Sequence, residues 1–116
     1  MERTKKYQWH KIAESVAEIG FEGNGIKEVL VNNKKACIVL HNNNLSACAQ
    51  KCPHAGGNLA DGYVDVQGNI VCPLHRYKFS LQNGRNISGE GYYLKTWPVE
   101  NREDGIYVAT EINILF

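Results

Sequence analysis

The chain has 116 residues, of which 43% are hydrophobic and 22% are charged, and its formal net charge is +1. This length and composition are typical of a globular chain that buries its own core, and we predict a single domain over residues 1–116. The balanced charge argues against nucleic acid or an anionic membrane surface as a partner. Neither a signal-like segment nor an apolar run long enough to span a membrane is present, so we predict a cytoplasmic protein.

Turn sequences divide the chain into short segments, and helical periodicity is nearly absent. One short helix is predicted at residues 13–19, where Gly20 would end it. Asn42-Asn43, Gln67-Gly68 and Asn83-Gly84 are predicted turns, because Asn and Gly readily adopt positive φ. Strands are predicted over residues 26–31, 36–41, 45–49, 63–66, 69–71, 77–81, 92–99 and 106–110. Many short strands separated by turns predict an all-β fold, either a sandwich or a barrel.

The turn at Asn42-Asn43 determines which residues of its two strands face each other. On this register His41 opposes Asn44, and Cys37 falls opposite Cys48. The two cysteines are expected on the less apolar face of the hairpin, and the more apolar face is expected to point into the core. We predict two reduced thiols that pack as small hydrophobic groups, with a strained cross-strand disulfide as the alternative.

Metal-binding side chains are concentrated in two short segments. The first is Cys52-Pro53-His54, and the second, Cys72-Pro73-Leu74-His75, begins after a gap of seventeen residues. Each segment offers one thiol and one imidazole directly after a predicted strand, where a loop can direct both side chains toward a common point. Thiolates combined with imidazoles select zinc, copper or iron–sulfur chemistry rather than magnesium or calcium.

The order of the donors, Cys, His, Cys, His, distinguishes among these metals. Zinc modules of the Cys₂His₂ kind pair two cysteines in one segment and two histidines in another. A binuclear cluster can instead take both cysteines on one iron and both histidines on the other, so that each loop supplies one ligand to each iron. We therefore predict a 2Fe–2S cluster, with a structural zinc-binding module as a less favoured alternative. The predicted ligands are Cys52, His54, Cys72 and His75.

The spacing Cys-X-His followed by Cys-X-X-His resembles the motif of the Rieske iron–sulfur family. The resemblance extends over residues 52–62 and 71–84, and it includes the segment 94–99. It implies a small antiparallel β sandwich with a cluster-binding subdomain of two loops at about residues 50–84. It also implies one Rieske-type 2Fe–2S cluster per chain.

This chain differs from the high-potential members of that family at several positions, and the differences favour a low-potential type. Those members carry one additional cysteine in each cluster loop, and the two form a disulfide. Here the corresponding positions look like Gly57, or a neighbouring residue, and Leu74. They also place hydroxyl donors near the sulfurs, where this chain has Tyr77 and Phe79. Phe79 has no hydroxyl, and the Tyr77 phenol is not expected to reach the sulfur. Fewer hydrogen-bond donors to the sulfurs predict a reduction potential toward the low end of the roughly −150 to +300 mV Rieske range.

The resemblance implies a soluble Rieske ferredoxin, which is an electron carrier and not an enzyme, and the sequence offers no candidate nucleophile or general base. Such ferredoxins pass single electrons from a flavin reductase to a terminal oxygenase. We expect weak, transient docking of these partners around His54, Ala55, Gly56, His75 and Arg76, where small residues allow close approach. The alternative is a Rieske subunit of a larger oxidoreductase, similar to the small subunit of nitrite reductase.

Overall fold

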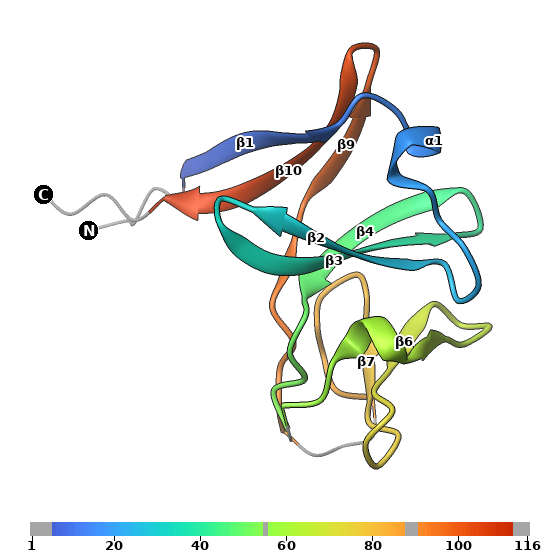
Figure 1. Cartoon of the computed structure of the whole chain (residues 1–116). Coiled ribbons are helices and arrows are strands. Elements are labelled where there is room, and N and C mark those ends of the chain that lie inside the picture. The colour runs from blue at the N-terminus through green and yellow to red at the C-terminus, as the bar shows by residue number, and fades with distance from the viewer. Residues whose placement is uncertain (1–5, 55, 88–90, 113–116) are drawn as a thin grey trace, which may run out of the picture.

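The fold is described here from a computed structural model, in which residues 6–54, 56–87 and 91–112 are described (Figure 1). These residues form short strands and very little helix. The strands are β1 (Lys6–Ala13), β2 (Ile26–Val31), β3 (Lys34–His41), β4 (Asn44–Ala49), β5 (Tyr63–Val64), β6 (Asn69–Val71), β7 (Lys78–Ser80), β8 (Thr96–Trp97), β9 (Val99–Arg102) and β10 (Gly105–Ile112). The helices are α1 (Val16–Ile19) and one 3₁₀ turn (Leu59–Asp61).

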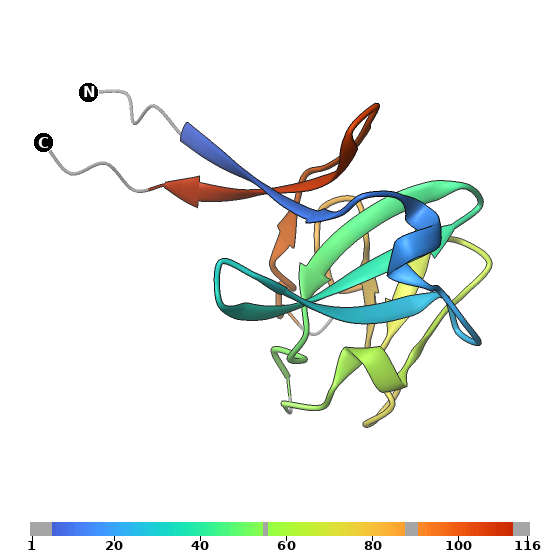
Figure 2. The same cartoon turned by 45° about the horizontal axis from the view of Figure 1, so that its top comes forward.

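The strands form three antiparallel sheets. Their orders are β1-β10-β9, β2-β3-β4-β8 and β5-β6-β7. Figures 1 and 2 show β2, β3 and β4 between the β1-β10-β9 sheet on one side and the β5-β6-β7 sheet on the other. The predicted all-β, antiparallel fold is therefore confirmed.

The β3-β4 hairpin contributes to two cores, one on each face. Ile38 and Ala47 pack with Ile106 and Val108 of β10, whereas Cys37 and other residues of the opposite face pack with the β5-β6-β7 sheet. The predicted register is confirmed, because His41 pairs with Asn44 and Cys37 with Cys48. The cysteine face, expected to be the less buried one, is as deeply buried as the other. It is covered by the β5-β6-β7 sheet, which hairpin register alone does not reveal.

Cys37 and Cys48 are free thiols with no exposed surface. A hydrogen bond with the Cys37 thiol, together with burial, raises the pKa of Cys48 well above its ordinary value. The Cys48 thiol therefore remains protonated at neutral pH, and both cysteines pack in the core as small hydrophobic side chains.

The predicted asparagine turn is confirmed, and a second one of the same kind joins β2 to β3. Asn42 and Asn43 have φ of 50° and 64°, and Asn32 and Asn33 have φ of 51° and 65°. Two consecutive left-handed residues match the right-handed twist of the strands that they connect. The predicted helix is shorter than expected: α1 begins after Ser15, whose hydroxyl accepts a hydrogen bond from the backbone N–H of Glu18.

Two predicted strands have different limits in the structure. The strand predicted over residues 92–99 is wrong, because β8 and β9 lie in different sheets on either side of Pro98. Proline has no N–H for a ladder, and the Pro98 carbonyl accepts from Ala109 at 3.0 Å. The strand predicted over 63–66 ends at Val64, because the Asp65 carboxylate accepts from the N–H groups of Gln67 and Asn69 and turns the chain.

β1 was not predicted at all. Its side chains are mostly exposed or half-buried and show no clear apolar alternation. The strand exists because its backbone pairs with β10 along almost its whole length. The described residues contain no helix with the length and apolarity that crossing a membrane requires.

We predict that Gly84→Ala lowers the free energy of unfolding by about 2–4 kcal/mol. Gly84 has φ +77°, and an added Cβ would lie 1.8 Å from the backbone oxygen of Leu94. That alanine would also disturb the 2.8 Å hydrogen bond from Leu94 N–H to the Gly84 carbonyl. Chemical denaturation of the two proteins measures the difference.

Gly91→Ala is the matched control, because Gly91 has φ +78° but no atom of the described residues lies within 4 Å of an added Cβ. It should cost about 1 kcal/mol, the cost of the left-handed backbone alone. Equal losses in the two variants would contradict the role of the Leu94 contact.

Candidate metal centre

The four predicted ligands lie in two loops that are closed in the same way. Loop 1 (residues 52–57) follows Lys51, which bridges to Asn58, and loop 2 (residues 72–77) joins β6 to β7. In loop 1 the Cys52 N–H donates to the carbonyl five positions on, at Gly57, over 2.8 Å. In loop 2 the Cys72 N–H donates to Tyr77, again five positions on, over 2.9 Å. Both loops lie at the lower end of the molecule in Figure 1.

The two thiols lie at the inner side of the loops. Cys52 is 1% exposed and Cys72 is 0% exposed, and both belong to the core between β3-β4 and β5-β6-β7. Burial raises the pKa of the Cys72 thiol, a hydrogen bond from the Leu74 backbone N–H lowers it, and contact with the Cys52 thiol raises it again. The net effect is a raised pKa of Cys72, so a metal that binds this thiol must displace its proton.

The two imidazoles lie toward the outside. His75 is exposed, His54 is half-buried, and their ring centroids are 5.6 Å apart at an interplanar angle of 82°. His75 and Arg76 have φ of 62° and 56°, so loop 2 turns sharply through two left-handed residues. Non-glycine residues adopt this backbone at some cost, which is often met at functional sites.

The residues present fit a bound cluster. The Nδ1 atom of His54 is buried and has no hydrogen-bond partner among the described residues. An unpaired buried polar atom costs about 1–3 kcal/mol, and a metal ligand is one reason to retain it. An added Cβ at Gly57 would lie 3.1 Å from Cys72 Sγ and 3.0 Å from Leu74 Cδ1. Loop 1 therefore passes close to the thiol of loop 2, where a larger residue would require its neighbours to shift by a few tenths of an ångström.

The predicted ligands come together as two pairs. The thiols of Cys52 and Cys72 contact each other in the core, and the rings of His54 and His75 contact each other outside it. Within the ranges that the structure describes, no three His, Cys, Asp or Glu side chains surround a single metal-ion position. Two sulfurs inside and two nitrogens outside is the sorting that a binuclear cluster requires. Ala55, which was included in the predicted docking surface, lies outside the described residues.

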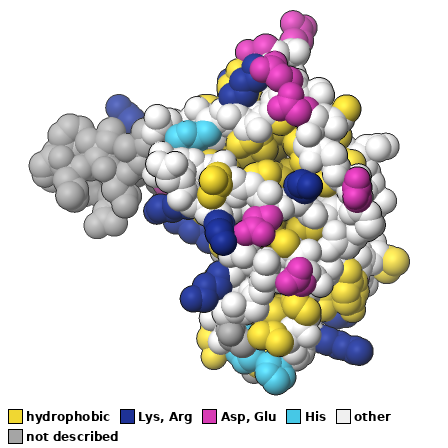
Figure 3. Space-filling model, viewed as in Figure 1, with side chains coloured by type: hydrophobic (Ala, Val, Ile, Leu, Met, Phe, Trp, Pro, Cys, Tyr) yellow, Lys and Arg dark blue, Asp and Glu magenta, His cyan; other side chains and the backbone are white. Residues whose placement is uncertain are grey.

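Two aromatic rings adjoin the histidine pair, and their contacts were missed at the level of sequence. Tyr77 stacks on His54 with ring centroids 3.7 Å apart and an interplanar angle of 27°. Tyr92 meets the same imidazole edge-on, at 5.4 Å and 69°. The sequence signal for this contact is the aromatic residue two positions after His75. Figure 3 shows histidine and hydrophobic side chains together at this end of the molecule.

The turn before β6 also supports loop 2. The Asp65 carboxylate accepts from the backbone N–H groups of Gln67 at 2.9 Å and Asn69 at 3.0 Å, and Lys78 lies 3.8 Å away. Burial opposes ionisation of this carboxyl, but these hydrogen bonds and the lysine outweigh it, so the pKa of Asp65 is lowered. The ionised side chain thus holds the turn that leads through β6 to Cys72.

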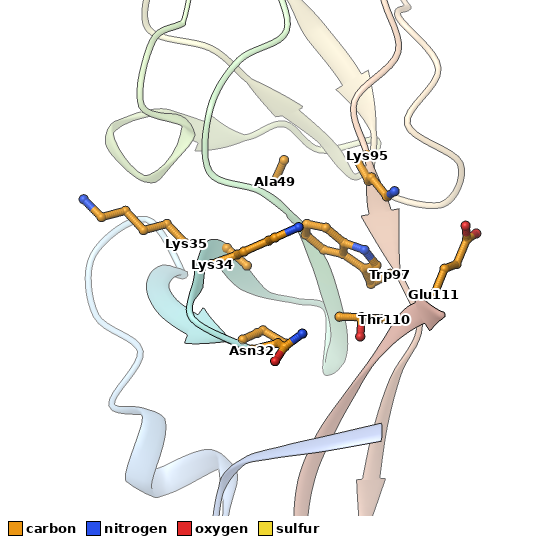
Figure 4. A pocket seen from close by; sticks show the side chains of 10 residues that line it. Asn32, Lys34, Lys35, Ala49, Lys95, Trp97, Thr110 and Glu111 are labelled. Atoms are coloured by element: carbon orange, nitrogen blue, oxygen red, sulfur yellow. The ribbon is translucent and has the colours of Figure 1, made fainter. Parts of the chain in front are cut away.

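A separate pocket of about 360 Å³ lies between the β2-β3 turn and the end of β10 (Figure 4). Lys34 and Lys95 lie on two sides of Trp97 in this view, and Ala49 forms part of the wall. None of the four predicted ligands lines it. The candidate metal centre is therefore confined to loops 1 and 2.

The chain is similar to several known proteins. Residues 8–98 match the family model of the Rieske [2Fe-2S] domain. The chain is 25% identical over 81 residues to the ferredoxin component of an alkene monooxygenase system from Xanthobacter autotrophicus, covering 70% of this chain and 66% of that protein. It is 39% identical over 67 residues to the NAD(P)H nitrite reductase of Emericella nidulans, covering 51% of this chain and 6% of that protein. The chain thus spans just under two thirds of the first relative and a small part of the second.

Among solved structures, the ferredoxin of carbazole 1,9a-dioxygenase from Nocardioides aromaticivorans aligns with a TM-score of 0.73 and 19% identity. The alignment covers 86% of this chain and 95% of that ferredoxin. This likeness shows the fold.

We predict that Asp65→Asn destabilises the protein by about 1 kcal/mol at pH 7 and by progressively less in acid. Because the folded pKa of Asp65 is lowered, its stabilisation is complete above the unfolded value of about 3.9 and is lost as pH falls through the folded value. Urea unfolding of both proteins from pH 7 to pH 3 measures the difference. A difference that stays constant with pH would contradict a role for the ionised carboxylate.

Proposed function

Because the chain belongs to the Rieske [2Fe-2S] domain family, we propose that loops 1 and 2 hold its cluster and that the protein carries single electrons between redox proteins. The observation that carries this proposal is the sorting of buried thiols inside and imidazoles outside, together with the buried His54 Nδ1 that has no hydrogen-bond partner among the described residues. The proposed ligands are Cys52, His54, Cys72 and His75.

The cysteines on the inner side of the site and the histidines on its outer side have different proposed roles. A bound 2Fe–2S cluster supplies reversible one-electron reduction. Cys52 and Cys72 hold it against a core that excludes water, and the Leu74 N–H donates to the Cys72 sulfur, where it stabilises added negative charge. His54 and His75 form the outer end and are the proposed route for the electron. Phe79 is wholly buried and offers no hydroxyl to the sulfurs, which supports a low potential.

The proposed partners are a flavin reductase as electron donor and a terminal oxygenase as acceptor, which dock transiently near His54 and His75. Leu74 and Tyr92 contact loop 1 and are 46% and 42% exposed. They add apolar surface beside the exposed Arg76, a combination suited to a small, short-lived interface. A cytoplasmic location suits this role, since the free thiols need a reducing compartment.

The second candidate function is an internal electron relay within a larger oxidoreductase. The similarity to a nitrite reductase, although restricted to a small part of that protein, favours it. A relay subunit copurifies with its larger partner in a fixed ratio from the native source, whereas a mobile carrier elutes alone. Size-exclusion chromatography of the native protein therefore separates the two functions.

We predict that the protein purified without oxygen contains about two irons and two acid-labile sulfides per chain. The reduced protein should give the EPR signal of a 2Fe–2S cluster. Cys52→Ser should remove most of the iron and sulfide, because the serine hydroxyl is a poor replacement for a thiolate.

Cys37→Ala is the control, because Cys37 is equally buried in the same core but is not a proposed ligand. It should retain the cluster at some cost in stability. A colourless wild-type protein with one zinc per chain would contradict the proposal, as would equal cluster loss in both cysteine variants.

We predict that Arg76→Glu slows electron transfer to or from a physiological partner by about three- to tenfold at low ionic strength. Arg76 is exposed on the turn of loop 2, so its charge acts at the proposed docking surface. Stopped-flow rates as a function of salt measure the effect. Lys6→Glu makes the same change of charge on β1, whose sheet packs in the core cluster that contains none of the four proposed ligands. An equal effect of both substitutions would place the docking surface elsewhere.

A further inference from the structure

Tyr77 contacts both loops through different parts of the residue. Its backbone carbonyl accepts the hydrogen bond from Cys72 N–H that closes loop 2. Its ring stacks on the imidazole of His54 in loop 1, with centroids 3.7 Å apart. We infer that Tyr77 is a positioning residue, which holds the His54 ring in its ligating orientation and keeps the two loops in register. This inference rests on the proposed assignment of His54 as a cluster ligand.

His54 needs such a partner because hydrogen bonds do not orient its ring. Ligating histidines are usually oriented by a hydrogen bond from the second ring nitrogen to a carboxylate or carbonyl group. In the described part of the chain, no hydrogen bond to the His54 ring is found, and its Nδ1 is buried and unpaired. The terminal torsion of histidine is broad, so the side chain alone does not fix the plane of its ring. Packing must therefore select the orientation.

The stack of Tyr77 on His54 sets the orientation of the imidazole. The rings of Tyr77 and His54 are inclined by only 27°, so the phenol ring sets the plane of the imidazole. Tyr92 lies edge-on to the same imidazole at 69° and restricts it from a second direction. Tyr77 itself is anchored, because it is half-buried and packs against the core that contains Cys52 and Cys72. A rigid support is thus continuous from the core to the ring of His54.

The two histidines are held by different means, which makes the inference specific. His75 lies in the left-handed turn with Arg76, so the backbone of loop 2 determines where its side chain begins. His54 is in contact with Tyr77 through its ring, and no comparable stack supports His75 among the described residues. Loss of the Tyr77 ring should therefore disturb one histidine ligand and leave the other nearly unchanged.

Three variants test this role. Tyr77→Phe keeps the ring, and Tyr77→Leu keeps apolar bulk but removes the flat face. Tyr63→Leu is the matched control, because Tyr63 is a half-exposed tyrosine on β5 that makes no ring contact with His54 among the described residues. Circular dichroism and thermal unfolding establish first that each variant is folded.

Pulsed EPR of the reduced, cluster-containing protein is the decisive measurement, because it resolves the couplings of the two histidine nitrogens separately. Tyr77→Leu should broaden one of these two couplings and leave the other, whereas Tyr77→Phe and Tyr63→Leu should match the wild type. Loss of an aromatic pair of this kind should also make release of iron about two to thirteen times faster, measured by the decay of visible absorbance. Rescue by phenylalanine would separate the ring's contribution from that of the hydroxyl.

NMR of the metal-free protein provides a readout that does not depend on the cluster. A ring stacked at 3.7 Å shifts the His54 ring protons upfield, and Tyr77→Leu should abolish that shift. Unchanged nitrogen couplings and unchanged iron release in a folded Tyr77→Leu protein would overturn the inference, as would wild-type His54 protons without the upfield shift. Purification without iron and sulfide under anaerobic conditions would instead overturn the proposed function, and the NMR measurement would still report on the stack.

Discussion

Two backbone hydrogen bonds set the geometry on which the candidate metal centre depends. The N–H groups of Cys52 and Cys72 each donate to the carbonyl five positions on, at 2.8 and 2.9 Å. Each bond turns its loop back on itself directly after the cysteine, so the thiol stays in the core while the histidine that follows is carried outward. Because both loops obey the same constraint, two thiols meet inside and two imidazoles meet outside. The two hydrogen bonds that close the loops thus place the sulfurs inside and the nitrogens outside, as a binuclear cluster needs.

The layered sheets make these closures possible. The β3-β4 hairpin is buried on both faces, with β10 against one and the β5-β6-β7 sheet against the other. The second face carries Cys37 and Cys48, two buried free cysteines that fill space in the core beneath the centre. An apolar core beneath the loops excludes water from their inner side. It thereby strengthens the electrostatic effect of each hydrogen bond donated to a sulfur. The sheets therefore exclude water and give rigid support, and the loops supply the candidate ligands.

Local residue chemistry explains why some features could be predicted. Asn42 and Asn43 tolerate left-handed backbone, so their turn and its register follow from their identity alone. The spacing of the cysteines and histidines likewise identifies a pair of loops, since such donors rarely occur together by chance. The errors have equally local causes. Pro98 divides a predicted strand between two sheets, and the Asp65 carboxylate ends another by accepting backbone hydrogen bonds. β1 has no apolar alternation to reveal it, because its stability comes from pairing with β10.

The amino-acid sequence alone was sufficient to predict the types of metal-binding side chain, their spacing and the antiparallel β fold class. Each of these depends on residues close together in the chain. Contacts between distant segments required the folded molecule. The stack of Tyr77 on His54 joins residues of two different loops, and no periodicity encodes it. The burial of Cys37 depends on a sheet that begins more than twenty residues later. Side-chain type and turn chemistry act over a few residues, whereas the orientation of a ring or the covering of a face is decided by what packs against it.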